Sequence, residues 1–436
     1  MNLSAALDQF EDICFNALSN ATFLDKRKNI RKSLRGRLKR LILEIILLYV
    51  VLTRKLSQGE RKTNSFDFSE PQHNLCKINF TQMAKYGKHT EKTYREAFCT
   101  VIDWFYANHA LLMQVSKPTD RLAIAIDPCH ISKAGKHTIW AGKFWSGCAS
   151  SAKWGLEILG IAALNIDLHD SFALKAVQTP DTKTLSEAGI ALFQWYADVI
   201  IRLKAQLMSV SKYIVADAAF PKDTFVNEIM KHGFHLVSRL RDDCRIQYLY
   251  TGPKEKRKGR PRRFEGFVDK KDIDASKVEE FFVEGMEGKL FTFIGHHPAL
   301  NRNLRIVIWQ MSDGKTKVFF STDTEMSGED VILYYRTRFQ IEFNYRDGKE
   351  FTGLCDCQAR SKDKLDFAFN ASLFAVNATK AFRYKSERSI SMSTFKLLMI
   401  NQYLSKRIFL MSGFRPNMRF IKLFNQALVE FQLDTC

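Results

Sequence analysis

The pattern that most restricts the fold of this chain is a series of apolar runs that begins near residue 120. The runs 121–127 (RLAIAID) and 213–220 (YIVADAAF) each predict a strand that ends at an acid, Asp127 and Asp217. Further strand patterns occupy 155–167, 171–179 and 235–240, and a helical pattern occupies 183–208. This order of three strands, a helix, and then alternating strand and helix predicts a mixed sheet flanked by helices.

The order of these elements is the one expected of an RNase H-like α/β core. Beyond it, a stretch rich in Gly, Lys and Arg with short β-like segments predicts a β-rich basic insertion, and strand patterns then return before a long helix that starts near Ser327. The first part of the chain has helical spacing of apolar residues. The predicted divisions are a helical N-terminal region, the first part of the core, the insertion, the second part of the core and C-terminal helices, at 1–115, 116–240, 241–305, 306–385 and 386–436.

Two aspartates that follow adjacent strands point to metal chemistry. A side chain at the end of a strand in an α/β sheet is exposed to the loops beyond it, where sites form. Carboxylates brought together from neighbouring strands, such as Asp127 and Asp217, hold hard divalent cations through oxygen. The alternative is that each aspartate only caps a helix or closes a turn, which is the usual role of a single acid at such a position.

A third acid lies in the helical pattern 330–350, EDVILYYRTRFQIEFNYRDGK. In one continuous helix, Tyr335, Arg338, Glu342 and Lys349 would fall within a sector of roughly 60°. Such a face presents a carboxylate beside three donors to phosphate oxygens, as a site for phosphodiester chemistry requires. The alternative is a solvated helix with an ion pair between Arg338 and Glu342.

The same helix carries a recognisable motif. Its Y-x2-R-x3-E-x6-K pattern, together with DPCHISKAGK, VADAAFPK, FVNEIMKHGFHLVSRLRDD and GRPRRF elsewhere, resembles a large family of bacterial insertion-sequence transposases with a DDE active site. The resemblance implies cut-and-paste DNA transposition by an RNase H-like core, with a β-rich insertion between the second aspartate and the glutamate. It implies that Asp127, Asp217 and Glu342 bind Mg2+, for which Mn2+ would substitute.

The resemblance also implies how DNA is held. Tyr335, Arg338 and Lys349 would bind phosphates near the transposon end, and the partners would be the terminal inverted repeats of the element and target DNA. Two ends must be paired, so a homodimer is expected. In some relatives a Trp on the strand before the glutamate helix grips a flipped base; here that strand reads KVFFST, and Trp309 lies one strand earlier.

The charge of the chain agrees with a polyanionic partner. Lys and Arg exceed Asp and Glu by 66 to 47, a net charge of +19, which fits nucleic acid but also ribosomes or anionic membranes. The apolar run 41–52 contains Glu44 and is shorter than the about 20 residues that a membrane span needs, so a membrane protein is not expected. Nine scattered cysteines, without a signal-peptide pattern, predict reduced thiols in a cytoplasmic protein. The resemblance implies that the location is the bacterial cytoplasm, at the nucleoid.

Three basic segments are weaker candidates for DNA contact. Nine Lys or Arg and no acid occupy 26–40, and 80–98 has the spacing of a helix-turn-helix, with Thr81 and Thr90 as expected caps and Tyr94 and Phe98 inward. The outward cations of the second segment are Lys88, Lys92 and Arg95, with His89 beside them. The segment 253–263 contains Arg260 and Arg262 in a Gly-Arg-Pro context. The alternatives are an ordinary pair of short helices and a flexible basic loop.

Two rival functions remain open on the sequence. An RNase H-like nuclease without strand transfer would share the three acids but has no evident need for the Tyr, Arg and Lys of the helix face. A DNA-binding protein derived from a transposase would have lost activity, and the three intact acids argue against that reading.

Overall fold

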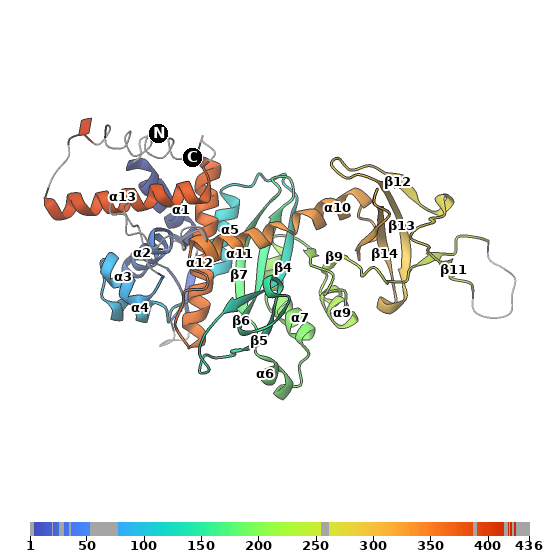
Figure 1. The fold of residues 1–436 in the computed structure, drawn as a ribbon, viewed down its shortest axis with the longest axis horizontal. Helices are drawn as coiled ribbons and strands as arrows, with labels where there is room; N and C mark the ends of the chain where they lie inside the picture. Colours follow the sequence, from blue (N-terminus) through green and yellow to red (C-terminus); the bar gives the residue numbers. More distant parts are fainter. Residues whose placement is uncertain are drawn as a thin grey trace, which may run out of the picture.

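The structure is a computed structural model of the chain (Figure 1). It describes residues 4–19, 21–25, 30–34, 36–52, 77–253, 261–386 and 390–413, with 417, 419, 420 and 423 near the C-terminus. Of the predicted DNA-contact residues, Arg260 therefore lies outside the described residues, as does much of its basic segment.

A mixed sheet of 12 strands forms the centre of the protein, in the order β11-β10-β13-β14-β15-β9-β8-β4-β6-β5, with β12 paired to β13 and β7 paired to β6. The first strands are β4 (Leu122–Ser132), β5 (Gly142–Ser146), β6 (Ser151–Asn165), β7 (Asp170–Gln178), β8 (Tyr213–Val215) and β9 (His235–Arg239). The others are β10 (Gln247–Leu249), β11 (Phe264–Phe267), β12 (Glu279–Phe281), β13 (Lys289–His297), β14 (Arg302–Gln310) and β15 (Thr316–Ser321).

The strand order β7-β6-β4-β8-β9 is consistent with the predicted RNase H-like core. The first three of these strands pair antiparallel, whereas β8 pairs in parallel with both β4 and β9. The connection between β7 and β8 contains α6 (Thr182–Glu187), α7 (Leu192–Arg202) and α8 (Lys204–Met208), and α9 (Asp223–Lys231) joins β8 to β9. The predicted succession of three strands, helical segment, strand, helix and strand is confirmed.

Two predicted strand ends were wrong. β4 does not end at Asp127 but continues to Ser132, because residues 128–132 stay paired with β6. β8 ends at Val215, and the rest of the predicted run 213–220 is not a strand. It forms a turn in which the N–H of the buried Phe220 donates to the carbonyl of Asp217.

The strands of the predicted insertion belong to the same sheet as the core. β15 pairs with β9, β14 with β15, and β13 with β14 over its whole length. The short strands β10, β11 and β12 complete this end of the sheet, which lies on the right in Figure 1. Two 3-10 helices connect these strands, η2 (Ala275–Lys277) and η3 (Pro298–Leu300).

Helices cover both faces of the core strands. One face packs on α5 (Trp104–Met113), α7 and α9, where alternate residues of β4 such as Ile124 and Ile126 are fully buried. The other face, with Ala123 and Ala125, packs on α10 (Gly328–Thr337), α11 (Gln340–Phe351) and α12 (Lys362–Lys385). Figure 1 shows α10 and α11 following one another across the sheet.

Asparagines of α12 cover the outer edge of β7. The side chain of Asn370 accepts from the N–H of Ala176 and donates to its carbonyl, and Asn377 does the same with Ala173. Each amide thus replaces the backbone of a missing neighbouring strand. An edge strand with satisfied backbone groups does not recruit a strand from another chain.

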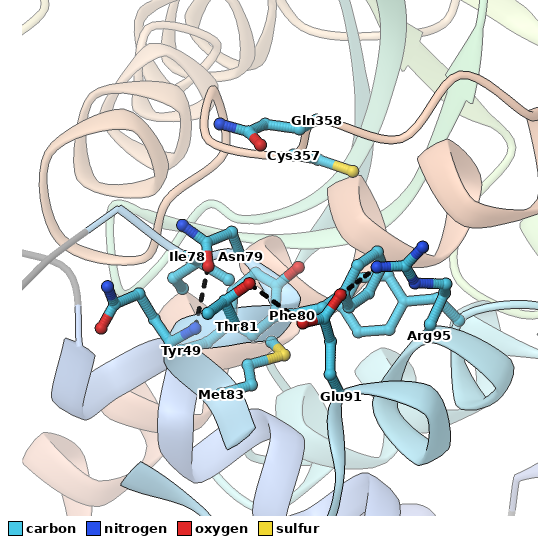
Figure 2. Close-up of a pocket in the computed structure, with 12 residues that line it drawn as sticks. Tyr49, Ile78, Asn79, Phe80, Thr81, Met83, Glu91, Arg95, Cys357 and Gln358 are labelled. Atoms are coloured by element: carbon cyan, nitrogen blue, oxygen red, sulfur yellow. Dashed lines mark hydrogen bonds and ion pairs between the residues drawn. The ribbon is translucent and has the colours of Figure 1, made fainter. Parts of the chain in front are cut away.

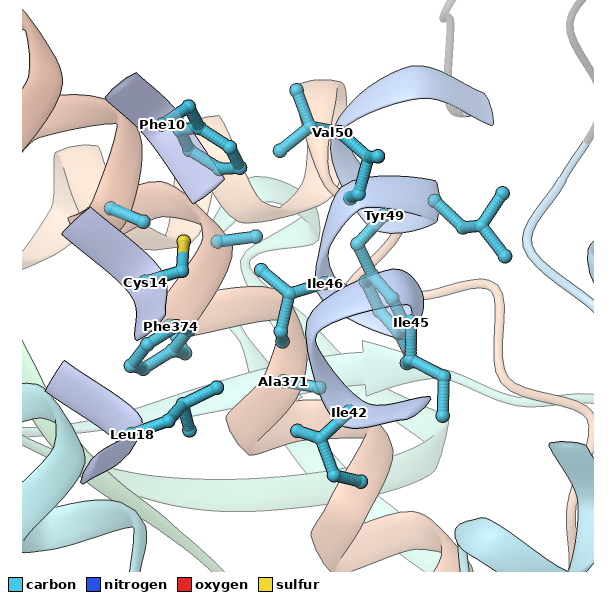
Figure 3. Close-up of a cluster of buried hydrophobic side chains, with 14 of the residues drawn as sticks. Phe10, Cys14, Leu18, Ile42, Ile45, Ile46, Tyr49, Val50, Ala371 and Phe374 are labelled. Carbon is cyan, nitrogen blue, oxygen red and sulfur yellow. The ribbon is translucent and has the colours of Figure 1, made fainter. Parts of the chain in front are cut away.

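The N-terminal region is helical, as predicted, but it also contains a small sheet that the sequence did not suggest. Its helices are α1 (Ser4–Ser19), α2 (Gly36–Leu52), α3 (Phe80–Tyr86), α4 (Glu91–Ala97) and α5, and its sheet has the order β2-β1-β3, with β1 (Thr22–Asp25), β2 (Ile30–Ser33) and β3 (Val101–Ile102). α1 and α2 share one hydrophobic core with α12 and α13 (Met392–Ser412), in which Phe10, Ile46 and Phe374 are buried (Figure 3). The run 41–52 lies in α2, and none of the described helices is long and apolar enough to cross a membrane.

Candidate active site

The register of β4 and β8, extended two residues beyond their ladder, would bring Asp127 and Asp217 to the same level of the sheet. Ile124 pairs with Ile214 and Ala125 with Val215, so each residue of β4 faces the residue 90 positions later (214 − 124 = 90). The same offset separates Asp127 from Asp217 (217 − 127 = 90). Because β8 ends at Val215, the edge of β4 beside Asp127 is left without a strand on this side.

Hydrogen bonds from the next strand hold the segment that carries Asp217. The buried hydroxyl of Ser238, on β9, lies 2.8 Å from both the Ala216 and the Asp217 carbonyl oxygens. The carboxylate of Asp217 accepts the N–H of Ala219 at 3.0 Å, which turns the chain away from the sheet. Asp217 is therefore positioned by backbone bonding although it lies two residues beyond the strand.

The helix predicted over 330–350 is divided into α10 and α11, so the expectation of one continuous face was wrong. α10 begins at Gly328, close to the predicted start near Ser327, which caps it, and ends at Thr337. At the junction the N–H groups of Ile341 and Glu342 bond to carbonyls three residues earlier, which is the 3-10 pattern rather than the α-helical one. Tyr335 thus belongs to α10, Glu342 and Lys349 belong to α11, and Arg338 lies between the two helices.

A direct contact fixes α11 against β4 beside the first aspartate. The hydroxyl of Tyr345 donates to the backbone carbonyl of Asp127 at 2.6 Å. It reaches this carbonyl over Gly160, the residue of β6 that pairs with Asp127, and a Cβ at Gly160 would overlap the hydroxyl. The absent side chain at Gly160 therefore allows the helix that carries Glu342 to approach the strand.

A buried polar network holds α11 on its other side. The Lys380 ammonium of α12 donates to Asp170 at 2.7 Å, to the Ser171 carbonyl at 2.7 Å and to the side chain of Asn344 at 2.8 Å. Asn344 in turn donates to the Ser171 hydroxyl. Asn344 is fully buried, so these bonds satisfy polar groups that would otherwise cost stability.

Arg338 stands between two of the three acids. Its guanidinium lies 3.2 Å from Glu342 Oε1 and 3.8 Å from Asp127 Oδ1, and its side chain is only 13% exposed. Its Nε is buried without a hydrogen-bond partner among the described residues. The guanidinium therefore neutralises the acids and keeps a donor that is not used within the described chain.

The carboxyl group of Asp127 has an unusual pKa. Burial raises it to about 7; the positive charge of Arg338 opposes this shift, and the negative charges of Asp217 and Glu342 add to it. The three acids thus interact electrostatically. Among the described residues, however, no group of three or more His, Cys, Asp or Glu side chains is close enough to hold a metal ion. The donors are carboxylate oxygens, which fit a hard divalent cation, but their arrangement is not that of an assembled metal site.

Tyr335 and Lys349 flank this centre. The ring of Tyr335 lies 5.0 Å from that of Phe319 and 5.7 Å from the Arg338 guanidinium carbon. Burial raises the pKa of its phenol, and the charge of Arg338 opposes the shift. The ammonium of Lys349 lowers the pKa of Cys129, which burial raises to about 12. Lys349 therefore lies beside β4 two residues beyond Asp127.

Arg239, at the end of β9, also lies near the centre, and the sequence reading did not single it out. Its charge, like that of Arg338, lowers the pKa of Tyr335. It pairs with Asp242 at 2.7 Å, and its Nε is buried without a partner among the described residues. The sequence feature that could have identified Arg239 is its position at the end of a predicted strand, the same feature that identified Asp127. Lys133, at the loop end of β4, donates to the carbonyls of Cys357 and Ala359 and is not directed at this centre.

The helix pair α3–α4 has the predicted arrangement, with one difference. Asn79 rather than Thr81 caps α3, whereas Thr90 caps α4 as predicted. Tyr94 and Phe98 are buried, and Lys88, His89, Lys92 and Arg95 are exposed. Glu44, the acid of the apolar run in α2, accepts the Tyr94 hydroxyl and the N–H of Lys88, which ties the turn to α2.

A cavity of about 320 Å³ lies between this helix pair and the segment after α11 (Figure 2). Its walls include Phe80, Gln82 and Arg95 on one side and Cys357 and Gln358 on the other. None of the three predicted acids lines it.

The basic residue Arg262, in the other predicted DNA-contact segment, is exposed with its guanidinium 4.8 Å from the ring of Tyr250.

Comparison with known proteins assigns the central part of the chain to one family. The model of the transposase DDE domain matches residues 121–378, which run from β4 to α12 and contain all three acids. No curated protein matches the chain. Enzymes of this family act on DNA with divalent metal ions. The match covers more than half of the sequence, and the chain belongs to the DDE transposase family, whose members are the enzymes of DNA transposition.

Proposed function

We propose that Asp127, Asp217 and Glu342 are the metal-binding carboxylates of this transposase. The observation that carries the proposal is the guanidinium of Arg338, which lies within 4 Å of both Asp127 and Glu342, while the negative charge of Asp217 also raises the pKa of Asp127. A buried place that already attracts a positive charge from two acids is suited to a metal cation. We propose Mg2+ as that cation, with Mn2+ able to replace it, because all three donors are carboxylates.

Tyr335, Arg338 and Lys349 are proposed to hold the phosphates of the transposon end, as in the subfamily with the Y-R-E-K motif. Arg338 and Arg239 support this assignment, because each has a buried Nε without a described partner. A phosphate oxygen would satisfy these donors with charge-assisted hydrogen bonds. Arg239 is therefore a further phosphate-binding residue in this proposal.

The chain would act in the reaction mainly by positioning. Asp127, Asp217 and Glu342 would hold the divalent ions, which would supply a nucleophilic water or 3′-hydroxyl and stabilise the leaving oxygen. Arg338, beside these carboxylates, would direct its guanidinium to the scissile phosphate. Tyr345 keeps Glu342 near Asp127 through its bond to the Asp127 carbonyl. The same site would cleave the transposon end and then join the freed 3′-hydroxyl to target DNA, in a cut-and-paste route with two protomers in the synaptic complex.

The first test is cleavage of labelled DNA that carries the inverted repeats flanking the gene. Asp217→Ala should abolish Mg2+-dependent nicking at the repeat boundary and leave repeat binding largely unchanged, because it removes a metal ligand and no DNA contact. Asp223→Ala, an exposed aspartate in the first turn of α9, is the matched control and should cleave like the wild type. Full cleavage by Asp217→Ala would contradict the assignment. Cleavage of any DNA regardless of the repeats would favour a general nuclease.

The N-terminal helices are proposed to contact DNA through the exposed cations of α3–α4, with Arg260 and Arg262 as further contacts. Neither Lys92 nor Lys88 makes a side-chain ion pair with the residues that the structure describes, whereas Arg95 pairs with Glu91. A cation that is already paired loses part of its attraction for phosphate. Lys92, on the same helix as Arg95, is therefore a stronger candidate than Arg95.

Salt dependence of binding distinguishes the two cations. Lys92→Ala should weaken repeat binding and reduce the slope of log affinity against log salt by about one phosphate contact. Arg95→Ala, on the same helix, should change both quantities less. Unchanged binding by both variants in a filter-binding assay at several salt concentrations would remove α4 from the DNA interface.

A further inference from the structure

A hairpin of β5 and β6 exposes two tryptophans to solvent. It consists of β5, the 3-10 helix η1 (Gly147–Ala149) and the first residues of β6, and we call residues 142–155 the tryptophan hairpin. Trp145 is 65% exposed and Trp154 is 45% exposed. Tryptophan is highly buried on average, and exposed tryptophans that share a surface indicate a place where a partner binds.

The charge of this part of the chain indicates the kind of partner. Between Asp127 and Glu157 there is no acid, four residues are lysines, and three of the six tryptophans of the protein occur there. Two of these lysines, Lys143 and Lys153, lie in the hairpin and are exposed. Aromatic rings beside lysines, without a nearby acid, fit a nucleic acid, whose bases and sugars meet the rings and whose phosphates meet the ammonium groups.

The tryptophans lie on the face of the sheet that carries Asp127. Asp127 pairs with Gly160 on β6, and side chains of a strand alternate between faces, so Trp154 shares the face of Gly160. Lys143 pairs with Trp154, which places Lys143 and Trp145 on this face as well. Figure 1 shows β5 at the lower end of the central sheet.

The distance along β6 from Gly160, beside Asp127, to Trp154 determines how far from the cut the hairpin would meet a bound DNA duplex. Six residues separate Gly160 from Trp154 (160 − 154 = 6), which corresponds to about 20 Å of strand. B-DNA rises about 3.4 Å per base pair. On this face Leu156 and Ile158 are buried under the covering helices, so the duplex would not lie on β6 itself. A duplex with one phosphate at the acids that runs parallel to β6, outside these helices, would reach Trp154 about six base pairs away.

We propose that the tryptophan hairpin binds the DNA duplex that carries the scissile phosphate, about six base pairs from the cut. Trp145 and Trp154 contact bases or sugars there, and Lys143 contacts the backbone. The inference rests on the proposed function, because the position of the cut is taken from Asp127. Its role is to set the path of the cleaved DNA across the sheet.

The test uses duplexes that carry the repeat boundary, shortened step by step on either side of the scissile phosphate. Wild-type binding and cleavage should fall by about tenfold once the duplex ends before the hairpin, since stacking on an aromatic ring contributes strongly for each base. The double variant Trp145→Ala/Trp154→Ala should show this loss already on the long duplex and no further loss on the short one. In hydroxyl-radical footprinting, with EDTA to prevent cleavage, the double variant should protect the same DNA as the wild type except about six base pairs from the cut, where its protection should be lost.

Two controls separate the possible outcomes. Phe282→Ala removes an aromatic ring that is 76% exposed next to β12, and it should bind and cleave like the wild type. Asp217→Ala should keep the footprint and lose cleavage; if it cleaved normally, the proposed active site would fail and the footprint would still report on the hairpin. The inference would be overturned if the double variant bound and cleaved long and short duplexes more weakly than the wild type by the same factor. It would also be overturned if the variant lost only the joining of the cleaved end to target DNA.

Discussion

The strand carboxylates and the helix carboxylate of the candidate site are held by different kinds of interaction. Asp127 lies within β4, whose backbone is paired with β6 and β8, and Asp217 follows β8 by two residues, where the hydroxyl of Ser238 on β9 bonds to its carbonyl. Glu342 is placed by side-chain contacts of α11, chiefly those of Tyr345 and Asn344. A strand ladder allows little displacement, whereas a helix that follows a 3-10 junction can shift when a few side-chain contacts change. Assembly of the site should therefore depend on the helix.

Arg338 joins the two parts, and its removal is expected to have the largest effect. Arg338→Ala should lower cleavage by about 100-fold or more, because a preorganised donor to the reacting phosphate is lost. The same substitution should tighten Mn2+ binding, since Asp127 and Glu342 lose the cation that now pairs with them. Isothermal titration with Mn2+ and single-turnover cleavage measure the two effects.

The control for this experiment is Arg338→Lys. It keeps the positive charge but loses the planar fork of donors, so cleavage should fall while the affinity for Mn2+ stays near that of the wild type. If Arg338→Ala bound Mn2+ more weakly than the wild type, the idea that the guanidinium occupies the place of a metal would be wrong.

The contact that holds α11 to β4 can be broken at Gly160. Gly160→Ala places a methyl group where the Tyr345 hydroxyl lies, and the helix with Glu342 must move outward. A displacement on the order of 1 Å at a reacting group lowers the rate by about 100-fold. Cleavage at saturating Mg2+ measures this loss.

The matched partner is the double variant Gly160→Ala/Tyr345→Phe. Removing the hydroxyl relieves the closest overlap, so the double variant should cleave faster than Gly160→Ala alone. Tyr345→Phe by itself should show only a small loss, because it removes one hydrogen bond to the Asp127 carbonyl. Equal activity of Gly160→Ala and the wild type would show that the position of α11 does not limit the reaction.

The strand half of the site was more predictable than the helix half, for a physical reason. The runs that contain Asp127 and Asp217 are apolar because both faces of their strands are buried, and that pattern is visible in the sequence. The junction at Arg338 contains neither Gly nor Pro, and both Arg338 and Phe339 keep αR backbone angles. A helical pattern therefore runs through it, and only the packing of α10 and α11 on the sheet reveals the division.

Short secondary-structure elements and isolated hydrogen-bond donors also could not be predicted from the sequence. The strands of the N-terminal sheet have two to four residues, too few for an alternation of apolar and polar residues to appear. The cap of α3 was assigned to Thr81, although Asn79 two residues earlier is an equally good capping residue and makes the bond. Arg239 acquires its place near Tyr335 only through the pairing of β9 with β8 and β15.

The smallest expected effect concerns the hydroxyl that supports Asp217. Ser238→Ala removes a buried donor to the Ala216 and Asp217 carbonyls, so unfolding should become easier by about 1–3 kcal/mol. Cleavage should fall by only a few-fold, on the order of what one hydrogen bond contributes, because the β4–β8 ladder still holds the level of Asp217. Ser372→Ala is the matched control, since it removes another buried hydroxyl, bonded to Thr352 and contributed by α12. If Ser372→Ala lowered the thermal midpoint as much as Ser238→Ala and lowered cleavage equally, the loss would reflect stability alone. A loss of cleavage specific to Ser238→Ala would show that even the strand half of the site needs support beyond its ladder.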